Sequence, residues 1–293
     1  MHTIEIPQKG FVAKIPASWA VLSAKDLRFV VKTYYVCLQQ GLSPLDFNVR
    51  VLYYFLGIKH NARSVRWERT HTQSDVDDRN SNIYELCDKC LSWMFAGDRA
   101  SLSYDSIISP LPKVRVGVFT SLVGPSDLCL DLTFGEYRAA SNALHQFLSS
   151  GDDDDLHTLL LCLYRRPARK MNLAGRKVRP LDASVGARER KAVAKMRPWQ
   201  KQLILLFFSA CVNYLQSSTI IVDGEELDMS LLYDGSGESK TPFGLNDLLS
   251  QLAKEGSMGT MDEVDAQPLP SVLREMWHNY KENKRYEEQR KQH

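Results

Sequence analysis

A strongly basic segment in the middle of the chain, residues 164–201, constrains the fold more than any other feature. It holds thirteen Lys or Arg residues against two acids, a formal charge of +11, so the rest of the 293-residue chain carries −9 for a net charge of +2. Proline and glycine recur along the segment, and both oppose a continuous helix. These residues are Pro167, Gly175, Pro180 and Gly186. We therefore predict an irregular connector that faces an anionic group, either in the chain itself or in a partner.

Apolar residues recur at the period of an amphipathic helix on both sides of this connector. The most apolar stretch, residues 199–215, is hydrophobic nearly all round, so we expect it at the centre of the core. Short alternating runs in residues 3–16, 113–125 and 218–232 predict β-hairpins. Further helices are predicted over residues 24–40, 44–56, 82–95, 134–148, 156–163 and 243–254, and after Pro270. The expected fold is mainly α (α+β), with a helical bundle-like core and two or three small β-hairpins.

The chain is predicted to have two parts. Residues 1–150 form an N-terminal β-ribbon with helices. Residues 151–293 form a C-terminal helical part that contains the basic connector 164–201 and ends in a projecting, charged helix. The polar stretch 59–80 is interpreted as a loop or weakly ordered insertion, and the alternating strand after residue 112 is expected to reach Val118.

Two acidic patterns mark predicted helix starts. Thr133 and Glu136 have the spacing of a capping box, in which the Thr hydroxyl accepts from the third amide and the Glu reaches back. Four consecutive Asp residues, 152–155, place negative charge where the helix dipole favours it. A divalent cation is the alternative for this run, although its spacing does not match a calcium loop.

The sequence contains no motif of a known catalytic chemistry. Neither HExxH nor GxSxG occurs, and the seven histidines are scattered. Cys87 and Cys90 have the CxxC spacing, which suits a metal site, redox chemistry or, because both lie on the apolar face of their helix, core packing. We favour core packing. We assign no catalytic residue, metal ion or cofactor, and predict that the protein is not an enzyme.

The N-terminus, the apolar stretches and the cysteines predict the cellular compartment of the protein. The N-terminus lacks the basic and apolar regions of a signal peptide, and the longest apolar stretch is too short to span a bilayer. The six cysteines mostly lie in apolar runs, which suits a reducing compartment. We expect a cytoplasmic protein without a membrane partner.

The basic segment has two interpretations. In the first, its cations pair with the chain's own acidic surface or with an acidic protein partner. In the second, they bind the phosphates of a nucleic acid while Tyr164 or Trp199 stacks on a base. The near-neutral total charge and the lack of a known nucleic-acid-binding motif favour the first. The candidate partner or polyanion residues are Arg165, Arg166, Arg169, Lys170, Arg176, Lys177, Arg179, Arg188, Arg190 and Lys191.

Parts of the sequence resemble a known group of proteins. The motifs IPASW near the N-terminus, DLTFGEYR at residues 131–138 and MRPWQ at residues 196–200 resemble uncharacterised proteins from tail-gene regions of phages and prophages of Bacteroidetes-type bacteria. The ending, residues 243–291, is similar to tail assembly chaperones encoded just before the tape-measure protein. The resemblance implies a non-enzymatic helper that holds an aggregation-prone helical tape-measure protein, or a minor tail component. It also implies a location in the bacterial cytoplasm or in the phage particle.

A helper of this kind needs an apolar surface for its partner helix. An apolar stripe on the last predicted helix supplies the candidate contacts, and burial of this stripe in the protein's own core is the alternative. The stripe consists of Val272, Leu273, Met276 and Trp277.

Overall fold

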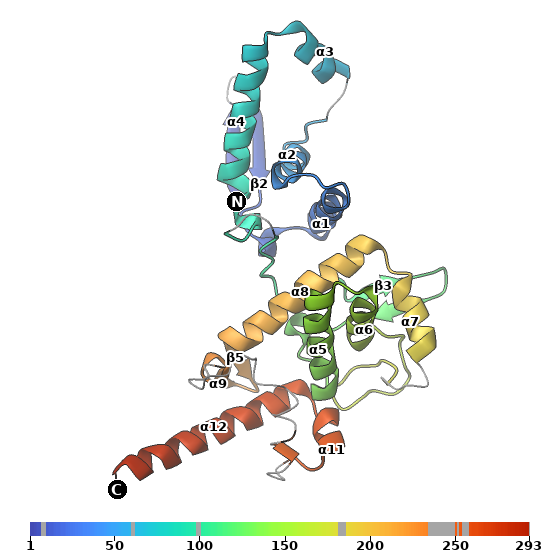
Figure 1. Ribbon diagram of the computed structural model, residues 1–293, viewed down its shortest axis with the longest axis vertical. Helices are drawn as coiled ribbons and strands as arrows, with labels where there is room; N and C mark the ends of the chain where they lie inside the picture. The colour runs from blue at the N-terminus through green and yellow to red at the C-terminus, as the bar shows by residue number, and fades with distance from the viewer. Residues whose placement is uncertain are drawn as a thin grey trace. The chain divides into compact units, whose positions relative to one another are not determined.

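The computed structural model describes residues 1–6, 10–59, 62–97, 101–180, 186–233, 250, 252–253 and 258–292. These residues are mainly helical and contain three two-stranded antiparallel sheets, so the predicted fold class is confirmed (Figure 1). The chain divides into two compact units, Met1–Ser106 (unit 1) and Ile107–His293 (unit 2). The boundary predicted at residue 150 instead lies inside unit 2, between two helices that pack against each other.

Unit 1 combines a β-ribbon with helices whose starts are capped by serine or threonine. In the ribbon, His2 lies opposite Ile15. Ser23 and Ser43 cap the first two helices by accepting hydrogen bonds from backbone amides three residues later. The elements are β1 His2–Ile6, β2 Phe11–Ile15, α1 Ala24–Gln39, α2 Pro44–Phe55, α3 Ala62–Thr70 and α4 Gln73–Leu91.

The prediction of a loop over residues 59–80 is wrong, because most of this stretch forms α3 and the first turns of α4. Thr72 and Asp75 make a capping box: the Asp75 amide donates to Thr72 Oγ1 at 3.2 Å, and Asp75 Oδ2 accepts from the Thr72 amide at 3.0 Å. Arg79 of α4 forms an ion pair with Glu68 of α3 at 3.0 Å. These polar contacts hold α3 and the first turns of α4, where the sequence has no continuous apolar stripe.

The core of unit 2 is centred on α8, Pro198–Ser217, so the prediction of a buried helix at residues 199–215 is confirmed. Helices α5, Phe134–Ser150, and α6, Asp153–Leu163, pack against each other across a turn at Gly151, whose φ is 70°. Glycine adopts this left-handed conformation without a Cβ clash. The other helices that the structure describes in unit 2 are α7 Gly186–Ala194, α9 Ser230–Tyr233, α11 Met261–Ala266 and α12 Leu269–Gln292.

Two β-hairpins flank this core. In the hairpin of β5, Thr219–Val222, and β6, Glu225–Asp228, the turn residues Asp223 and Gly224 have φ values of 51° and 83°. Two positive values are typical of the type I′ turn that Asp-Gly favours. In the other hairpin, β3 covers Lys113–Arg115 and β4 covers Ser121–Val123.

The strand predicted to reach Val118 ends earlier, because β3 stops at Arg115 and the chain turns back over the next five residues. Val118 and Phe119 occupy this turn, and they are 81 % and 99 % exposed. The prediction for Val118 is therefore wrong. Two adjacent apolar residues cannot both face the core in an extended strand.

The basic segment continues this small sheet as irregular chain over residues 165–180, whereas residues 186–194 form α7, so the prediction of an irregular connector over residues 164–201 holds only in part. Val123 of β4 and Arg165 exchange two backbone hydrogen bonds, of 2.8 and 3.2 Å. The chain then doubles back, with the Arg179 amide donating to the Arg166 carbonyl at 3.0 Å. We call residues 165–180 the basic loop. It is non-helical, as its prolines and glycine predict.

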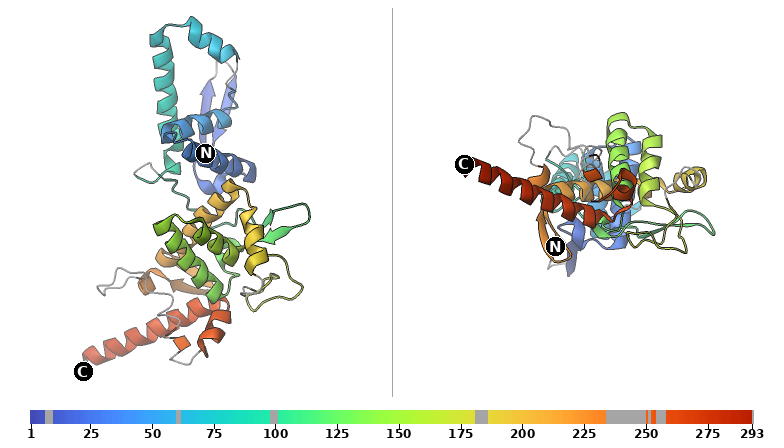
Figure 2. Two further views of the ribbon diagram at one scale, coloured as in Figure 1. Left: turned by 45° about the vertical axis from the view of Figure 1, so that its right-hand side comes forward. Right: turned by 90° about the horizontal axis from the view of Figure 1, so that it is seen from below.

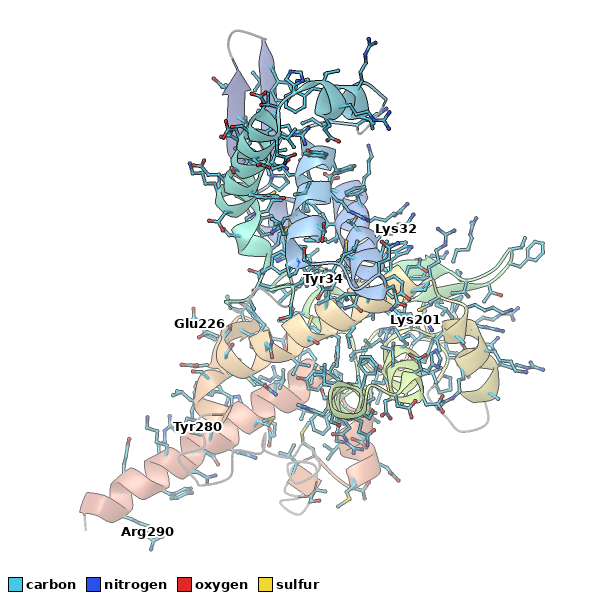
Figure 3. The ribbon with its side chains drawn as sticks, turned by 45° about the horizontal axis from the view of Figure 1, so that its top comes forward. Lys32, Tyr34, Lys201, Glu226, Tyr280 and Arg290 are labelled. Carbon is cyan, nitrogen blue, oxygen red and sulfur yellow. The ribbon has the colours of Figure 1, made fainter. Side chains whose placement is uncertain are left out.

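The last helix, α12, packs its first turns against α5, α9 and β6. Residues 282–286 and 288–290 of this helix are exposed. Figure 3 shows Tyr280 partway along α12 and Arg290 near its end. The helix predicted over residues 243–254 lies almost entirely outside the described residues. In the part of the chain that is described, no helix combines the length and the apolar character that crossing a membrane requires.

Candidate functional site

A buried ionic network joins the basic loop to the start of α5. Glu136, in the first turn of α5, accepts a hydrogen bond from Arg165 Nη2 through Oε1, and its Oε2 lies 3.5 Å from Arg176 Nη1. Arg165 and Arg176 are only 1 % and 4 % exposed. Glu136 Oε2 also accepts from the Thr133 amide at 3.2 Å, so the predicted capping box is confirmed. One carboxylate thus caps a helix and neutralises buried cations.

The rest of the network balances the charge of the two arginines. Both guanidinium groups donate to backbone carbonyl oxygens at 2.8 Å. Asp131 Oδ2 lies 3.4 Å from Arg176 Nε. Burial lowers the pKa of Arg176, while the charges of Asp131 and Glu136 act in the opposite direction. Two cations therefore face two carboxylates, as a buried site requires.

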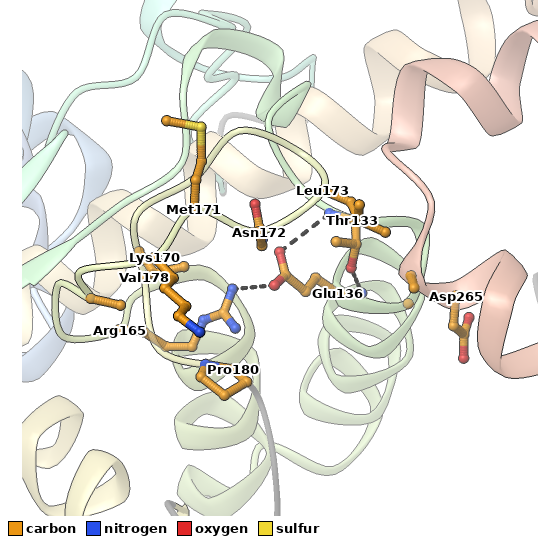
Figure 4. A pocket seen from close by; sticks show the side chains of 13 residues that line it. Thr133, Glu136, Arg165, Lys170, Met171, Asn172, Leu173, Val178, Pro180 and Asp265 are labelled. Atoms are coloured by element: carbon orange, nitrogen blue, oxygen red, sulfur yellow. Dashed lines mark hydrogen bonds and ion pairs between the residues drawn. The ribbon is translucent and has the colours of Figure 1, made fainter.

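An open groove of about 750 Å³ lies against this network (Figure 4). The start of α5, the basic loop and the end of α11 line it. Figure 4 shows Glu136 between its two partners Arg165 and Thr133. Met171 and Leu173 of the basic loop also line the groove, and they are 57 % and 69 % exposed. The groove thus combines a neutralised ionic floor with solvent-exposed apolar side chains.

The α11 wall of the groove is held by a two-pronged ion pair. Arg138 donates to Asp265 through Nε, at 3.1 Å to Oδ1, and through Nη2, at 2.5 Å to Oδ2. Gly135 allows this close approach, because a Cβ there would lie 2.9 Å from the Asp265 Cβ. The absence of a side chain at residue 135 therefore sets how closely α11 lies against α5.

The structure removes Arg165 and Arg176 from the predicted set of partner or polyanion contacts, because buried guanidinium groups cannot reach an external ligand. Two further candidates face a buried acid of α7. Arg166 Nε and Arg179 Nη1 lie 3.6 and 3.9 Å from Glu189 Oε1. The interpretation that these cations pair with the chain's own acids is supported for all four.

The other predicted basic residues lie on the surface. Arg190 of α7 pairs with Asp154 at 3.3 Å. The remaining candidates are exposed, and no ion pair to another described residue is seen for any of them. They are Arg169, Lys170, Lys177, Arg188 and Lys191.

The predicted partner-helix stripe belongs to the protein's own core. Val272, Leu273 and Trp277 of α12 are buried, and Met276 is half-buried. Burial in the core, the alternative left open by the sequence, therefore holds for most of the stripe. The same correction applies to Tyr164 and Trp199, since both rings are buried and cannot stack on a nucleic-acid base.

The CxxC pair lies in the core of unit 1, as we favoured from the sequence. Cys87 and Cys90 are both buried. Burial, with a smaller effect of Cys90, raises the pKa of Cys87 to about 11, so its sulfur is a thiol at neutral pH. Over the described ranges, no group of three or more His, Cys, Asp or Glu side chains is arranged to hold a metal ion.

Sequence reasoning missed the acids that neutralise the basic loop and the apolar tip of the β3/β4 hairpin. Glu136 was recognised only as a helix cap, and Asp131 and Glu189 were assigned no partner. The adjacent residues Val118 and Phe119 did carry a signal, because two neighbouring apolar residues interrupt the alternation of the strand.

Comparisons of the chain with protein-family models, with curated proteins and with solved structures find no match. No residue role is therefore transferred from a relative.

Proposed function

We propose that the protein is a non-enzymatic binding protein that holds a helical segment of another protein in the groove beside Glu136. The groove itself carries this proposal, since it is open, has a volume of about 750 Å³ and presents Met171 and Leu173 to solvent. Exposed apolar side chains around a groove favour the apolar face of a partner helix. Methionine adds adaptability, because its unbranched side chain fits irregular surfaces.

The partner that agrees with the sequence resemblance is a long, aggregation-prone helical protein of the tape-measure type. In that role the protein is a tail assembly chaperone, and a minor tail component is the related alternative. The groove supports binding over catalysis because its acids are already engaged. Glu136 pairs with Arg165, and Asp265 pairs with Arg138. A catalytic acid or base must exchange a proton with its substrate, which such pairing opposes.

The exposure of the two apolar side chains sets the size of their contribution to binding. Fully burying a Leu or Met side chain contributes about 1.5–3 kcal/mol. Because Met171 and Leu173 are 57 % and 69 % exposed, a partner that covers both gains about 1–2 kcal/mol from each. Their joint replacement is expected to weaken binding by at least about thirtyfold.

Where a long helical reading frame adjoins the gene, co-expression with its product tests the proposal. The double variant Met171→Ser/Leu173→Ser is compared with Leu148→Ser, which removes an exposed apolar side chain near the other end of α5. We expect the long protein to stay soluble and co-purify with the wild type and Leu148→Ser, and to be lost with the double variant. Equal recovery with all three, or a long protein that is soluble and unbound when expressed alone, would refute the proposal.

The alternative function, a nucleic-acid-binding accessory protein, draws on a set of exposed cations, of which Lys170 also lines the groove. The exposed cations of the basic loop and α7 favour it, and they are the subject of the inference below.

A further inference from the structure

Among the described residues, internal ion pairs neutralise one part of the basic segment, and no ion pair is seen for another part, which we call the free part. The free part consists of Arg169, Lys170 and Lys177 in the basic loop and Arg188 and Lys191 in α7. On the neighbouring hairpin, Lys113 and Arg115 are exposed on β3 while Val114 between them is buried. No ion pair to another residue in the described ranges is seen for these seven cations. All seven side chains are exposed, so an external anion can reach them.

The elements that carry these cations are joined side by side. The backbone of β4 pairs with Arg165 of the basic loop, and Arg166 and Arg179 of that loop face Glu189 of α7. Figures 1 and 2 show the β3/β4 hairpin, the basic loop and α7 on the same side of unit 2. Because these elements adjoin one another, we treat their exposed cations as one surface, the basic platform.

An apolar tip stands at the edge of the basic platform. Val118 and Phe119 form the turn between β3 and β4, and the Phe119 side chain is 99 % exposed. A phenyl ring in this position contributes nothing to the core, while Lys113 and Arg115 lie on the strand that leads to it. The hairpin thus offers one free aromatic face next to a set of free cations.

We propose that the basic platform and the hairpin tip bind a single-stranded polynucleotide. The phosphates contact the free cations, and one base stacks on Phe119. Positively charged grooves combined with exposed aromatic rings are the chemistry by which single strands are bound without sequence preference. A single strand leaves its base faces open to the ring, whereas bases inside a duplex are already stacked on each other.

The composition of the surface favours a polynucleotide over an acidic protein. Lysine is depleted at the centres of protein interfaces, where aromatic and apolar residues dominate over about 800 Å² on each side. Here the exposed apolar side chains are two at the tip and two, Met171 and Leu173, in the basic loop, while seven cations are spread over three elements. The inference goes beyond the proposed protein-binding function, and none of Phe119, Arg188 and Lys191 lines the groove.

Fluorescence anisotropy with labelled oligo(dT) and oligo(U) of about 20 nucleotides tests the inference, with the full chain at about 50 mM salt. Phe119→Ala is expected to weaken binding about tenfold through lost stacking. Tyr286→Ala is the matched control, because it removes an exposed ring on α12. We expect it to leave affinity unchanged. Thermal unfolding of both variants should match the wild type, since both rings are exposed.

The salt dependence tests the cations separately. For single strands, the slope of log K against log salt changes by about 0.7 for each phosphate contact. Arg188→Ala/Lys191→Ala is therefore expected to reduce the slope by about 1.4. The control Lys284→Ala/Arg285→Ala removes two exposed cations of α12 and should leave the slope unchanged.

Binding of either oligonucleotide with these responses supports the inference, and a difference between oligo(dT) and oligo(U) identifies the type of strand. No binding of either at low salt overturns it. It is also overturned if Phe119→Ala and Tyr286→Ala behave alike. If polyglutamate binds as tightly as the oligonucleotides and is indifferent to Phe119, the surface belongs to an acidic protein partner and the inference fails.

Discussion

Replacing Glu136 with glutamine removes one negative charge from the centre of unit 2 and turns the carboxylate oxygen that accepts from Arg165 into an NH2 donor. The amide of Gln has nearly the size of the carboxylate, and its oxygen can still accept a hydrogen bond from the Thr133 amide. Arg165 and Arg176 keep their hydrogen bonds to backbone carbonyl oxygens. The variant therefore leaves the buried guanidinium groups without their shared anion and removes the acceptor of the Arg165 side chain.

The structure sets the expected magnitude. Removing one partner of a buried ion pair costs about 3–5 kcal/mol, because the other charge is left uncompensated. Asp131 stays 3.4 Å from Arg176 and keeps that cation paired, so the lower end, about 3 kcal/mol, is expected. For a unit of this size, this loss corresponds to a fall in Tm of about 6–12 °C. Glu136→Ala should cost about 1 kcal/mol more, because it also removes the capping acceptor.

Urea unfolding of the full chain, followed by circular dichroism, measures the loss, and hydrogen exchange of peptides from α5 and α6 assigns it to unit 2. Glu226→Gln is the matched control, because Glu226 is exposed on β6. Its expected effect on the free energy of unfolding is within about 0.5 kcal/mol.

A second variant tests the cause. In Glu136→Gln/Arg165→Met the uncompensated cation is also removed, so the double variant should be more stable than Glu136→Gln alone. A loss of stability below about 1 kcal/mol for Glu136→Gln would contradict this reasoning. So would a double variant whose loss equals the sum of the losses measured for Glu136→Gln and Arg165→Met alone, because the two residues would then not depend on each other.

Two further predictions concern the groove wall and the response to pH. Gly135→Ala should destabilise unit 2 by about 1–3 kcal/mol in urea unfolding, because the new Cβ would lie 2.9 Å from the Asp265 Cβ. Gly117→Ala, where the nearest atom is 4.0 Å away, should be nearly neutral, and equal losses would contradict this reasoning. Burial, assisted by the charge of Lys201, lowers the pKa of His157 from 6.5, so the unfolded chain binds this proton more readily than the folded chain. Stability should therefore fall as pH is lowered below about 6.5, and His157→Gln should flatten that slope between pH 5 and 7; an unchanged slope would exclude His157 as its source.

Much of the secondary structure could be predicted because its causes are local. The apolar run over residues 199–215 specifies a buried helix, the Asp223-Gly224 pair specifies a tight turn, and Thr133 with Glu136 specifies a helix start. The prediction of a loop at residues 59–80 failed because helix prediction relied on an apolar stripe. In this stretch a capping box and one interhelical ion pair stabilise the helices instead. The prediction that the strand reaches Val118 failed because it followed the alternation of the valines and did not use the interruption at Val118 and Phe119.

The candidate site could be predicted only in part, because its residues come from distant parts of the chain. The groove combines the start of α5 with the basic loop and with Asp265 and Ala266 of α11. No periodic pattern relates these three segments. The prediction of partner contacts on α12 failed for a related reason. An apolar stripe has the same sequence pattern whether it packs against a partner or in the core of its own protein.

The sequence alone established that the chain is mainly helical, that a +11 segment breaks the helical pattern in its middle, and that the rest of the chain carries a compensating charge. Helix caps, turns and apolar periodicity depend on a few neighbouring residues, so the secondary structure that they specify can be predicted from the sequence. Which cations are neutralised was set by tertiary packing, because Glu136 meets Arg165 and Arg176 across 29 and 40 residues of chain. Desolvation penalises any buried charge without a partner, so folding matched these cations with acids and left the others on the surface.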